Sequence, residues 1–233
     1  MAAIVFISLN AIAQKKPVPV KKPIANSPVL KNLTDCASYA IGVSVANFYA
    51  QQVMKSLNAT MVSKAITDAM SGKKMLLNDT ECNTVVMKFI NQASEAKAKP
   101  NIAAGQKFLV ANKTKAGVKT TSSGLQYEVI IEGKGTKPTA GDSVTCHYAG
   151  TLLNGMEIDN SFKRGAPITF SVTGVIKGWT EALQLMPEGS KYKLYIPQEL
   201  AYGTNDHGDI PAGSTLIFEV ELLKVIGKNT KSQ

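Results

Sequence analysis

The fold is decided by one stretch near the C-terminal end, Leu216-Ile217-Phe218-Glu219-Val220-Glu221-Leu222. Its apolar and acidic residues alternate with a period of two, which is typical of a strand with one buried face. The same alternation recurs over residues 191–196, 144–148 and 124–129, and glycines and prolines separate these runs. Short alternating strands between turn residues predict an antiparallel sheet. One helical stretch, Trp179 to Met186, lies among them, so residues 118–227 are expected to form an α+β domain with one helix against the sheet.

The residues that precede this domain, 31–117, have the helical period instead. A first helix is expected from near Thr34, because apolar residues recur three and four positions apart after it. A second is expected to follow Asn58 and to end at Gly72, since glycine readily adopts the left-handed backbone found at helix C-termini. The first half of the chain is therefore predicted to be an all-helical domain.

A third helix is expected to begin after Asn78, and it meets a proline. Glu81 stands three residues after Asn78, which is the spacing of a capping box. The helical pattern continues to about Lys115 but includes Pro100 on the way. Two outcomes stay open: Pro100 kinks one long helix, or it ends that helix and Asn101 caps a new one.

The two ends of the chain differ from these domains in composition. Residues 1–13 are apolar and end in Ala11-Ile12-Ala13, the small-x-small pattern that precedes cleavage of a secretory signal. We expect them to be a signal-peptide remnant, although the usual positive segment is missing and a frayed apolar N-terminus stays an alternative. Residues 14–30 hold four prolines and four lysines, which favours a flexible tether over a structured arm. Residues 228–233 are expected to form a tail.

The positive charge of the chain is concentrated in its first half. The net charge is +9, yet residues 1–117 carry 15 lysines against 5 acidic residues, whereas residues 118–233 are close to neutral. Arg164 is the only arginine. Proteins that read nucleic-acid bases rely on arginine side chains, so this composition argues against nucleic acid as a partner. The lysines of the first half are interpreted as a solvated face, with a surface for anionic clients or envelope lipid as the alternative.

The sequence offers no support for metal binding or for a membrane span. The three cysteines form no Cys-x-x-Cys pair and the two histidines are His147 and His207, which argues against a zinc site. No run reaches the roughly 18 consecutive apolar residues of a transmembrane segment. Cys36 and Cys82 either form a bridge after export or remain free thiols, and both alternatives stay open.

Seven short motifs within residues 124–222 occur in an order and at a spacing that resemble one known family. They are Gly124-Leu125-Gln126-Tyr127, His147-Tyr148-Ala149-Gly150, Ile158-Asp159-Asn160-Ser161, Val175-Ile176-Lys177-Gly178-Trp179, Leu200-Ala201-Tyr202-Gly203, Ile210-Pro211 and the stretch from Leu216 to Leu222. Residues 118–227 thereby resemble the FKBP family of peptidyl-prolyl cis-trans isomerases. The helical half is similar to the N-terminal domain of the bacterial two-domain members, of the macrophage infectivity potentiator and FkpA type. The resemblance implies an antiparallel sheet wrapped on one short helix, preceded by a helical dimerisation domain.

The chemistry of prolyl isomerisation calls for an apolar site. Rotation about an Xaa-Pro bond breaks amide resonance, with a barrier of roughly 18–20 kcal/mol, but it moves no proton and forms no covalent intermediate. A planar amide is more polar than a twisted one, so an apolar cavity disfavours the ground state relative to the transition state. Aromatic and aliphatic walls therefore suit the reaction, and no nucleophile, cofactor or metal is expected.

The resemblance also implies which residues form the site. The expected catalytic residues are Tyr148, Asp159, Tyr202 and Phe218. The expected substrate-binding residues are Ile158, Arg164, Ile168, Val175, Ile176, Trp179, His207 and Ile210. By the family's pattern, Trp179 forms the floor under the proline ring, the Tyr202 hydroxyl donates to a substrate carbonyl and the backbone N–H of Ile176 contacts another. Asp159 is costly in an apolar wall unless it is paired, and Arg164 is its natural partner.

For several of these residues a purely structural role stays open. Trp179, Phe218 and Tyr148 also fit ordinary core positions, and Asp159 with Arg164 fits a solvated loop pair. Two positions depart from the family's pattern. Ile158 stands where phenylalanine is usual, and Ile168 stands at a position that is often aromatic. These departures bear on rate, substrate preference and drug affinity more than on the fold.

The expected function is isomerisation of Xaa-Pro bonds in folding polypeptides outside the cytoplasm, in the periplasm or cell envelope. The expected partners are proline-containing unfolded chains, macrolides such as tacrolimus and rapamycin, and a second copy of the chain bound through the N-terminal helices. Two other functions stay open: a client-binding chaperone with weak isomerase activity, and an interaction or adhesion factor built on an FKBP scaffold.

Overall fold

The computed structural model describes residues 29–51 and 57–227, which belong to two compact units divided after residue 55. The first unit holds the helix α1 (Leu33–Gln51). Its start is fixed by Asn32, whose side-chain oxygen accepts a hydrogen bond of 2.9 Å from the backbone N–H of Asp35. The helix expected from near Thr34 is therefore confirmed. The predicted signal remnant at 1–13, nearly all of the tether at 14–30 and the tail at 228–233 lie outside the described residues.

The second unit begins with the helix α2 (Ala59–Met70), whose two ends are fixed by local chemistry. The side chain of Asn58 accepts a hydrogen bond of 3.2 Å from the backbone N–H of Met61, as a helix N-cap does. At the other end, Gly72 has a φ of 64°, the left-handed conformation that only glycine adopts without strain. Both predicted boundaries of this helix are confirmed.

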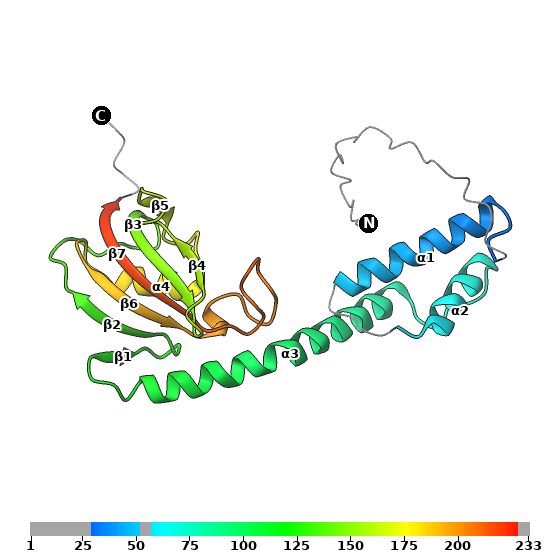
Figure 1. The fold of residues 1–233 in the computed structure, drawn as a ribbon, viewed down its shortest axis with the longest axis horizontal. Coiled ribbons are helices and arrows are strands. Elements are labelled where there is room, and N and C mark those ends of the chain that lie inside the picture. Colours follow the sequence, from blue (N-terminus) through cyan, green and yellow to red (C-terminus); the bar gives the residue numbers. More distant parts are fainter. Residues whose placement is uncertain (1–28, 52–56, 228–233) are drawn as a thin grey trace. The chain divides into compact units, whose positions relative to one another are not determined.

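Helix α3 (Asp79–Asn112) runs for 34 residues without interruption (Figure 1). Its N-terminus has the predicted capping box: Asn78 accepts from the Glu81 backbone at 2.9 Å, and Glu81 accepts from the Asn78 backbone at 2.8 Å. Pro100 lies inside the helix, so the alternative that it ends the helix and that Asn101 caps a new one is wrong. The helix ends at Asn112 rather than near Lys115, because turns lead from there into the first strand.

Seven strands form one sheet in which every pair is antiparallel, as predicted. The order is β1-β2-β6-β7-β3-β4, and β5 also pairs with β3. The strands are β1 (Val118–Thr120), β2 (Gln126–Ile131), β3 (Ser143–Leu152), β4 (Glu157–Asn160), β5 (Ile168–Ser171), β6 (Lys191–Ile196) and β7 (Leu216–Ile226). A 3-10 turn, η1 (Gln198–Leu200), follows β6. The long central strands β3 and β7 contribute Tyr148 and Phe218 to the site, and the other residues that reach it come from β4, β5, α4 and the loops that precede α4 and β7.

The helix α4 (Lys177–Leu185) packs against the sheet and closes the core (Figure 1). Along β7 the side chains of Phe218, Val220 and Leu222 are buried, as the alternating sequence predicts. Gly178 allows α4 to lie close to β6, because a Cβ at this position would lie 2.5 Å from a methyl carbon of Ile196. The α+β prediction, an antiparallel sheet on one short helix, is confirmed.

Candidate functional site

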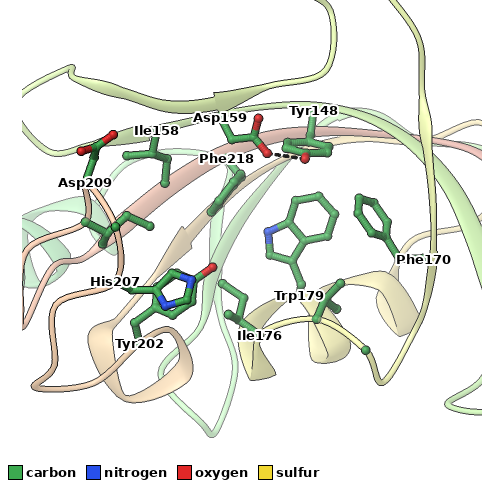
Figure 2. A pocket seen from close by; sticks show the side chains of 14 residues that line it. Tyr148, Ile158, Asp159, Phe170, Ile176, Trp179, Tyr202, His207, Asp209 and Phe218 are labelled. Atoms are coloured by element: carbon green, nitrogen blue, oxygen red, sulfur yellow. Dashed lines mark hydrogen bonds between the residues drawn. The ribbon is translucent and has the colours of Figure 1, made fainter. Parts of the chain in front are cut away.

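A cavity of about 630 Å³ opens between the sheet, α4 and the loop that precedes β7 (Figure 2). Its walls are mostly aromatic and aliphatic, with a few polar groups, which is the usual character of a small-molecule or peptide site. The lining residues are Tyr148, Ile158, Asp159, Phe170, Gly174, Val175, Ile176, Trp179, Tyr202, His207, Gly208, Asp209, Ile210 and Phe218.

The floor of the cavity is the indole of Trp179, which is only 4% exposed. Three aromatic rings surround it, and each meets it nearly edge to face. The ring centroids of Tyr148, Phe218 and Phe170 lie 5.2, 5.3 and 5.7 Å from that of Trp179, at interplanar angles of 88°, 89° and 77°. Such edge contacts hold the rings in a fixed geometry. The site therefore presents a rigid apolar box to whatever enters it (Figure 2).

One glycine on β3 makes room for the ring of Phe218. Gly150 lies directly opposite Phe218 in the β3–β7 ladder. A Cβ on Gly150 would lie 2.8 and 2.9 Å from the Cδ1 and Cζ atoms of that ring. Carbon atoms in contact normally stay about 3.5–4.0 Å apart. The glycine of the His147-Tyr148-Ala149-Gly150 motif thus sets the position of one pocket wall.

One of the two carboxylates that line the cavity, Asp159, stands in the apolar wall and takes part in several hydrogen bonds. The hydroxyl of Tyr148 donates to it at 2.5 Å, the backbone N–H of Asn160 donates at 2.8 Å, and the Arg164 guanidinium forms an ion pair with it. Arg164 also donates to the Tyr148 hydroxyl at 2.8 Å. Burial opposes ionisation of Asp159, but the hydrogen bonds from Tyr148 and Arg164 outweigh it and hold the carboxyl pKa below its usual value.

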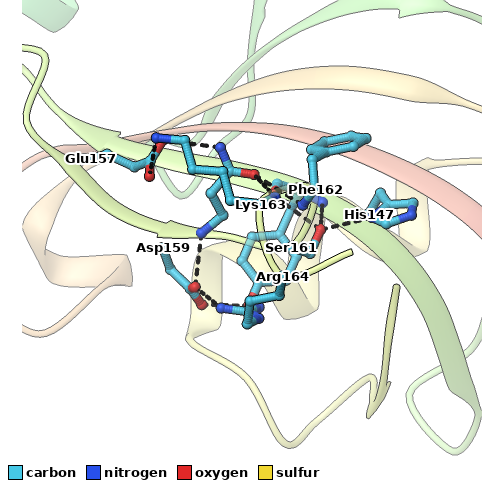
Figure 3. A network of polar contacts seen from close by, with 9 residues as sticks. His147, Glu157, Asp159, Ser161, Phe162, Lys163 and Arg164 are labelled. Carbon is cyan, nitrogen blue, oxygen red and sulfur yellow. Dashed lines mark hydrogen bonds and ion pairs between the residues drawn. The ribbon is translucent and has the colours of Figure 1, made fainter. Parts of the chain in front are cut away.

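A second set of polar contacts fixes the strand and turn that carry Asp159 and Arg164 (Figure 3). The Ser161 hydroxyl accepts from the backbone N–H of Tyr148 at 2.7 Å and lies 2.9 Å from Nδ1 of His147. The His147 ring stacks on Phe162 with centroids 4.5 Å apart. These contacts hold the turn after β4 against β3 and so position the Asp159–Arg164 pair.

Two potential donors in the site, the Tyr202 hydroxyl and the Ile176 N–H, have no acceptor within residues 29–51 and 57–227. The Tyr202 ring stacks on His207 with centroids 4.2 Å apart and an interplanar angle of 9°. Burial raises the pKa of Tyr202, so its hydroxyl keeps its proton at neutral pH. Among the described residues, neither this hydroxyl nor the backbone N–H of Ile176 donates a hydrogen bond within the chain. Both residues line the cavity, where a bound molecule can accept from them.

Ten of the twelve residues that the sequence nominated line this one cavity. The other two, Arg164 and Ile168, are not in its lining: Arg164 reaches the cavity only through Asp159 and Tyr148, and Ile168 packs against the core from β5. Phe170, Gly174, Gly208 and Asp209 line it although the sequence reasoning did not nominate them. Phe170 shares a strand face with Ile168, and that spacing of two was the signal that could have found it.

Within residues 29–51 and 57–227, no group of three or more metal-ligating side chains is found. Nor does any described helix have the length and apolar character to cross a membrane. The three cysteines are free thiols, and Cys146 is the buried one. Burial raises the pKa of the Cys146 thiol to about 12.

The family resemblance is confirmed by comparison with known proteins. The model of the FKBP-type peptidyl-prolyl cis-trans isomerase family matches residues 134–223, and the model of the domain amino-terminal to it matches residues 34–129. FkpA of Aeromonas hydrophila, an FKBP-type isomerase, is 39% identical over 97% of this chain and 92% of its own. The outer membrane protein MIP of Legionella longbeachae is 41% identical over 82% of this chain and 85% of its own. The crystal structure of Escherichia coli FkpA matches with a TM-score of 0.57 and 37% identity, over 85% of this chain and 99% of that one. With both domains matched and an aromatic pocket of the expected composition, the chain belongs to the family of FKBP-type peptidyl-prolyl cis-trans isomerases.

Proposed function

We propose that the chain isomerises Xaa-Pro bonds in the cavity over Trp179, with the proline ring of the substrate lying against the indole. The observation that carries this proposal is the box of three aromatic edges around one buried tryptophan. Such a box accepts a small, apolar ring and excludes water from the amide beside it. A prolyl amide in this environment loses hydration that favours its planar, polar form, so the twisted form is favoured by comparison.

Two donors hold the peptide on either side of the proline. The Tyr202 hydroxyl and the Ile176 N–H line the cavity and have no acceptor among the described residues, which suits them to two carbonyl groups of the substrate. When the peptide is held on both sides of the Xaa-Pro bond, rotation about its C–N axis is the main motion that remains possible. His207 stacks on Tyr202 and keeps that hydroxyl in place.

Asp159 acts as the polar member of the wall, and Arg164 acts through it. The hydrogen bonds from Tyr148 and Arg164 keep the carboxylate ionised and oriented while it faces the cavity. Arg164 and Ile168 lie outside the lining, so we assign them to the support of the walls rather than to contact with substrate. Phe170 takes the aromatic place that the sequence reasoning sought at Ile168.

The site assignment is tested by kinetics on a short proline-containing peptide. Asp159→Leu and Phe218→Ala are expected to lower kcat/KM by 10-fold or more while the circular-dichroism spectrum stays native. The matched control is Ile131→Ala, because Ile131 is 54% exposed at the end of β2 and lies outside the cavity lining. Unchanged kcat/KM in both pocket variants would overturn the assignment.

Macrolides of the tacrolimus and rapamycin class are proposed to bind in the same cavity. Support comes from its apolar walls and its two donors without acceptors. Trp179 is the only tryptophan in the chain, so its fluorescence reports occupancy of the floor directly. Rapamycin should change this fluorescence and inhibit isomerisation over the same concentration range. A fluorescence change without inhibition would place the drug elsewhere.

The N-terminal helices are proposed to bind a second copy of the chain. The support is the match to the amino-terminal domain of the family, together with large apolar side chains left exposed on these helices. They include Tyr39, Ile41, Val43 and Phe48 on α1, Met61 and Ile66 on α2, and Val85, Met87 and Phe89 on α3. An apolar surface of this kind is costly in water and is covered most simply by a symmetric partner.

Light scattering on the full chain tests this assembly. The expected mass is twice the 24.8 kDa of one chain. Phe48 is 57% exposed, so Phe48→Glu should not disturb one protomer but should halve the measured mass. Leu223→Glu, at a residue 43% exposed on β7, is the control and should leave the dimer intact. A monomeric wild-type chain would defeat the proposal.

Export to the periplasm or cell envelope is proposed from the N-terminal sequence. The apolar residues 1–13 end in a small-x-small pattern, and one relative carries the name outer membrane protein. The isomerase would then assist the folding of exported proteins. N-terminal sequencing of the protein from its native host should begin at Gln14 or nearby, and an intact residue 1 in a cytoplasmic fraction would refute export.

A further inference from the structure

One wall of the cavity is a long loop without regular structure, from Ala201 to Thr215. The part of it that contributes most residues to the cavity lining is the turn from His207 to Ile210, which is closed by backbone hydrogen bonds of 2.9 and 3.0 Å between these two residues. A loop of this length has many accessible conformations unless something outside it holds it. The support comes from α3, a helix that precedes the catalytic domain in the chain (Figure 1).

Two residues of α3 hold the loop at points on either side of this turn. The Lys97 ammonium forms an ion pair with Asp206, the residue just before His207. The side-chain amide of Asn101 donates a 2.8 Å hydrogen bond to the carbonyl of Ala212, two residues after Ile210. The anchors are linked to each other, because the other oxygen of Asp206 accepts from the Ala212 N–H at 2.9 Å.

Close packing of Gly213 against α3 reinforces the two anchors and restricts movement of the loop relative to the helix. Ala98 on α3 is fully buried and Ala212 is 2% exposed, so the contact is dry. Gly213 has a φ of 76°, and a Cβ there would lie 2.6 Å from the Ala98 carbonyl oxygen. Of the two anchors, the Asn101 amide is the stronger, since it is partly buried, whereas the Lys97 and Asp206 side chains are 46% and 41% exposed.

We propose that Asn101, supported by Lys97, is a positioning residue for the isomerase: it holds the His207 to Ile210 turn in the conformation that binds substrate. The inference rests on the isomerase site and adds to it a residue of α3. If the loop adopts the substrate-binding conformation only part of the time, the apparent affinity for substrate falls in proportion to the fraction of molecules in that conformation. The rate of the chemical step in the bound state is unchanged. Loss of the anchor should therefore raise KM and leave kcat alone.

The kinetic test uses the full chain and three substitutions at one position. Asn101→Ala and the isosteric Asn101→Asp both remove the donor and should raise KM about 3- to 10-fold, the effect of one hydrogen bond, with kcat unchanged. Asn101→Gln keeps an amide donor and should recover part of the affinity. Lys97→Met should raise KM less. Gln106→Ala and Lys99→Met, at exposed positions of the same helix, are the matched controls and should match the wild type.

Hydrogen exchange supplies a readout that does not depend on activity. It therefore distinguishes failure of the positioning proposal from failure of the isomerase assignment. In Asn101→Ala, the amides of residues 201–215 should exchange faster, whereas those of β3 and β7 should not. Selective exchange together with a raised KM supports the proposal. An unchanged KM, a loss in kcat alone, or exchange that rises equally over residues 118–227 overturns it, because the last result indicates a merely structural role.

Discussion

The space that Gly150 leaves for Phe218 gives the sharpest prediction about the wall of the pocket. In Gly150→Ala, the new Cβ lies 2.8 and 2.9 Å from two ring carbons, where about 3.5 Å is the closest comfortable approach. The ring must therefore move by roughly 1 Å, since Gly150 lies within β3 and is paired with Phe218 in the ladder to β7. Overpacking of this kind typically lowers the free energy of unfolding by about 1–3 kcal/mol. A displacement near 1 Å at a reacting site lowers the rate by as much as about 100-fold.

We expect Gly150→Ala to stay folded and to lose about 10- to 100-fold in kcat/KM on a short proline-containing peptide. Gly42→Ala is the matched control: a Cβ on Gly42 meets no atom within 4 Å, and the residue lies inside α1. It should leave kcat/KM unchanged. A double-mutant cycle with Phe218→Leu, which lacks the outer ring carbons, separates the mechanism from general damage. If the two changes add without coupling, or if Gly150→Ala is fully active, the reasoning about the ring is refuted.

Three further predictions concern the polar groups of the catalytic domain. Tyr202→Phe removes one neutral hydrogen bond to substrate and should lower kcat/KM about 2- to 10-fold, with no change in thermal stability beyond error; an unchanged kcat/KM would show that the hydroxyl does not contact substrate. The folded-state pKa of Asp159 lies below its usual value, because its hydrogen bonds outweigh the effect of burial. Ionised Asp159 therefore makes its full contribution to the free energy of unfolding above about pH 4, and this contribution is lost as the pH falls through the lowered pKa. Isomerisation should accordingly stay constant from pH 7 to about 5, and a loss centred at pH 5 or above would contradict this. Iodoacetamide should label Cys36 and Cys82 in the native chain but not Cys146, whose burial raises its thiol pKa to about 12; rapid labelling of Cys146 would contradict its assigned burial.

The features that could be predicted from sequence are those with local causes. Asn58, Asn78 and Gly72 mark helix ends because a cap acts within one turn of the chain. The strands were predictable because one buried face imposes an alternation of two. The floor at Trp179 could be assigned only because the motif from Val175 to Trp179 resembles the pattern of the FKBP family; the structure adds that Gly178 packs against the sheet and places the indole at the start of α4.

The features that escaped prediction depend on contacts between distant residues. Ile168 and Phe170 share one face of β5, so alternation alone does not say which side chain reaches the cavity. The hydrogen bond from Asn101 to Ala212 joins residues 111 positions apart. The buried residues of α3 are small or polar, namely Ser94, Ala98, Gly105 and Asn112, so they give no hydrophobic signal for a buried contact.

Because Pro100 lies inside α3, the hydrogen bond from Asn101 to Ala212 also has an effect on the helix. Pro100 has no N–H, so the carbonyl of Ala96 has no backbone donor four residues on, and the helix is intrinsically weakest at this turn. Lys97 and Asn101, whose side chains bond to the pocket loop, lie on either side of it. Coupling free energies are reciprocal, so a ligand that orders the loop must stiffen the helix by the same amount that the helix improves its binding. If Asn101 positions the loop as proposed, binding of substrate in the pocket therefore stabilises α3 at the turn around Pro100.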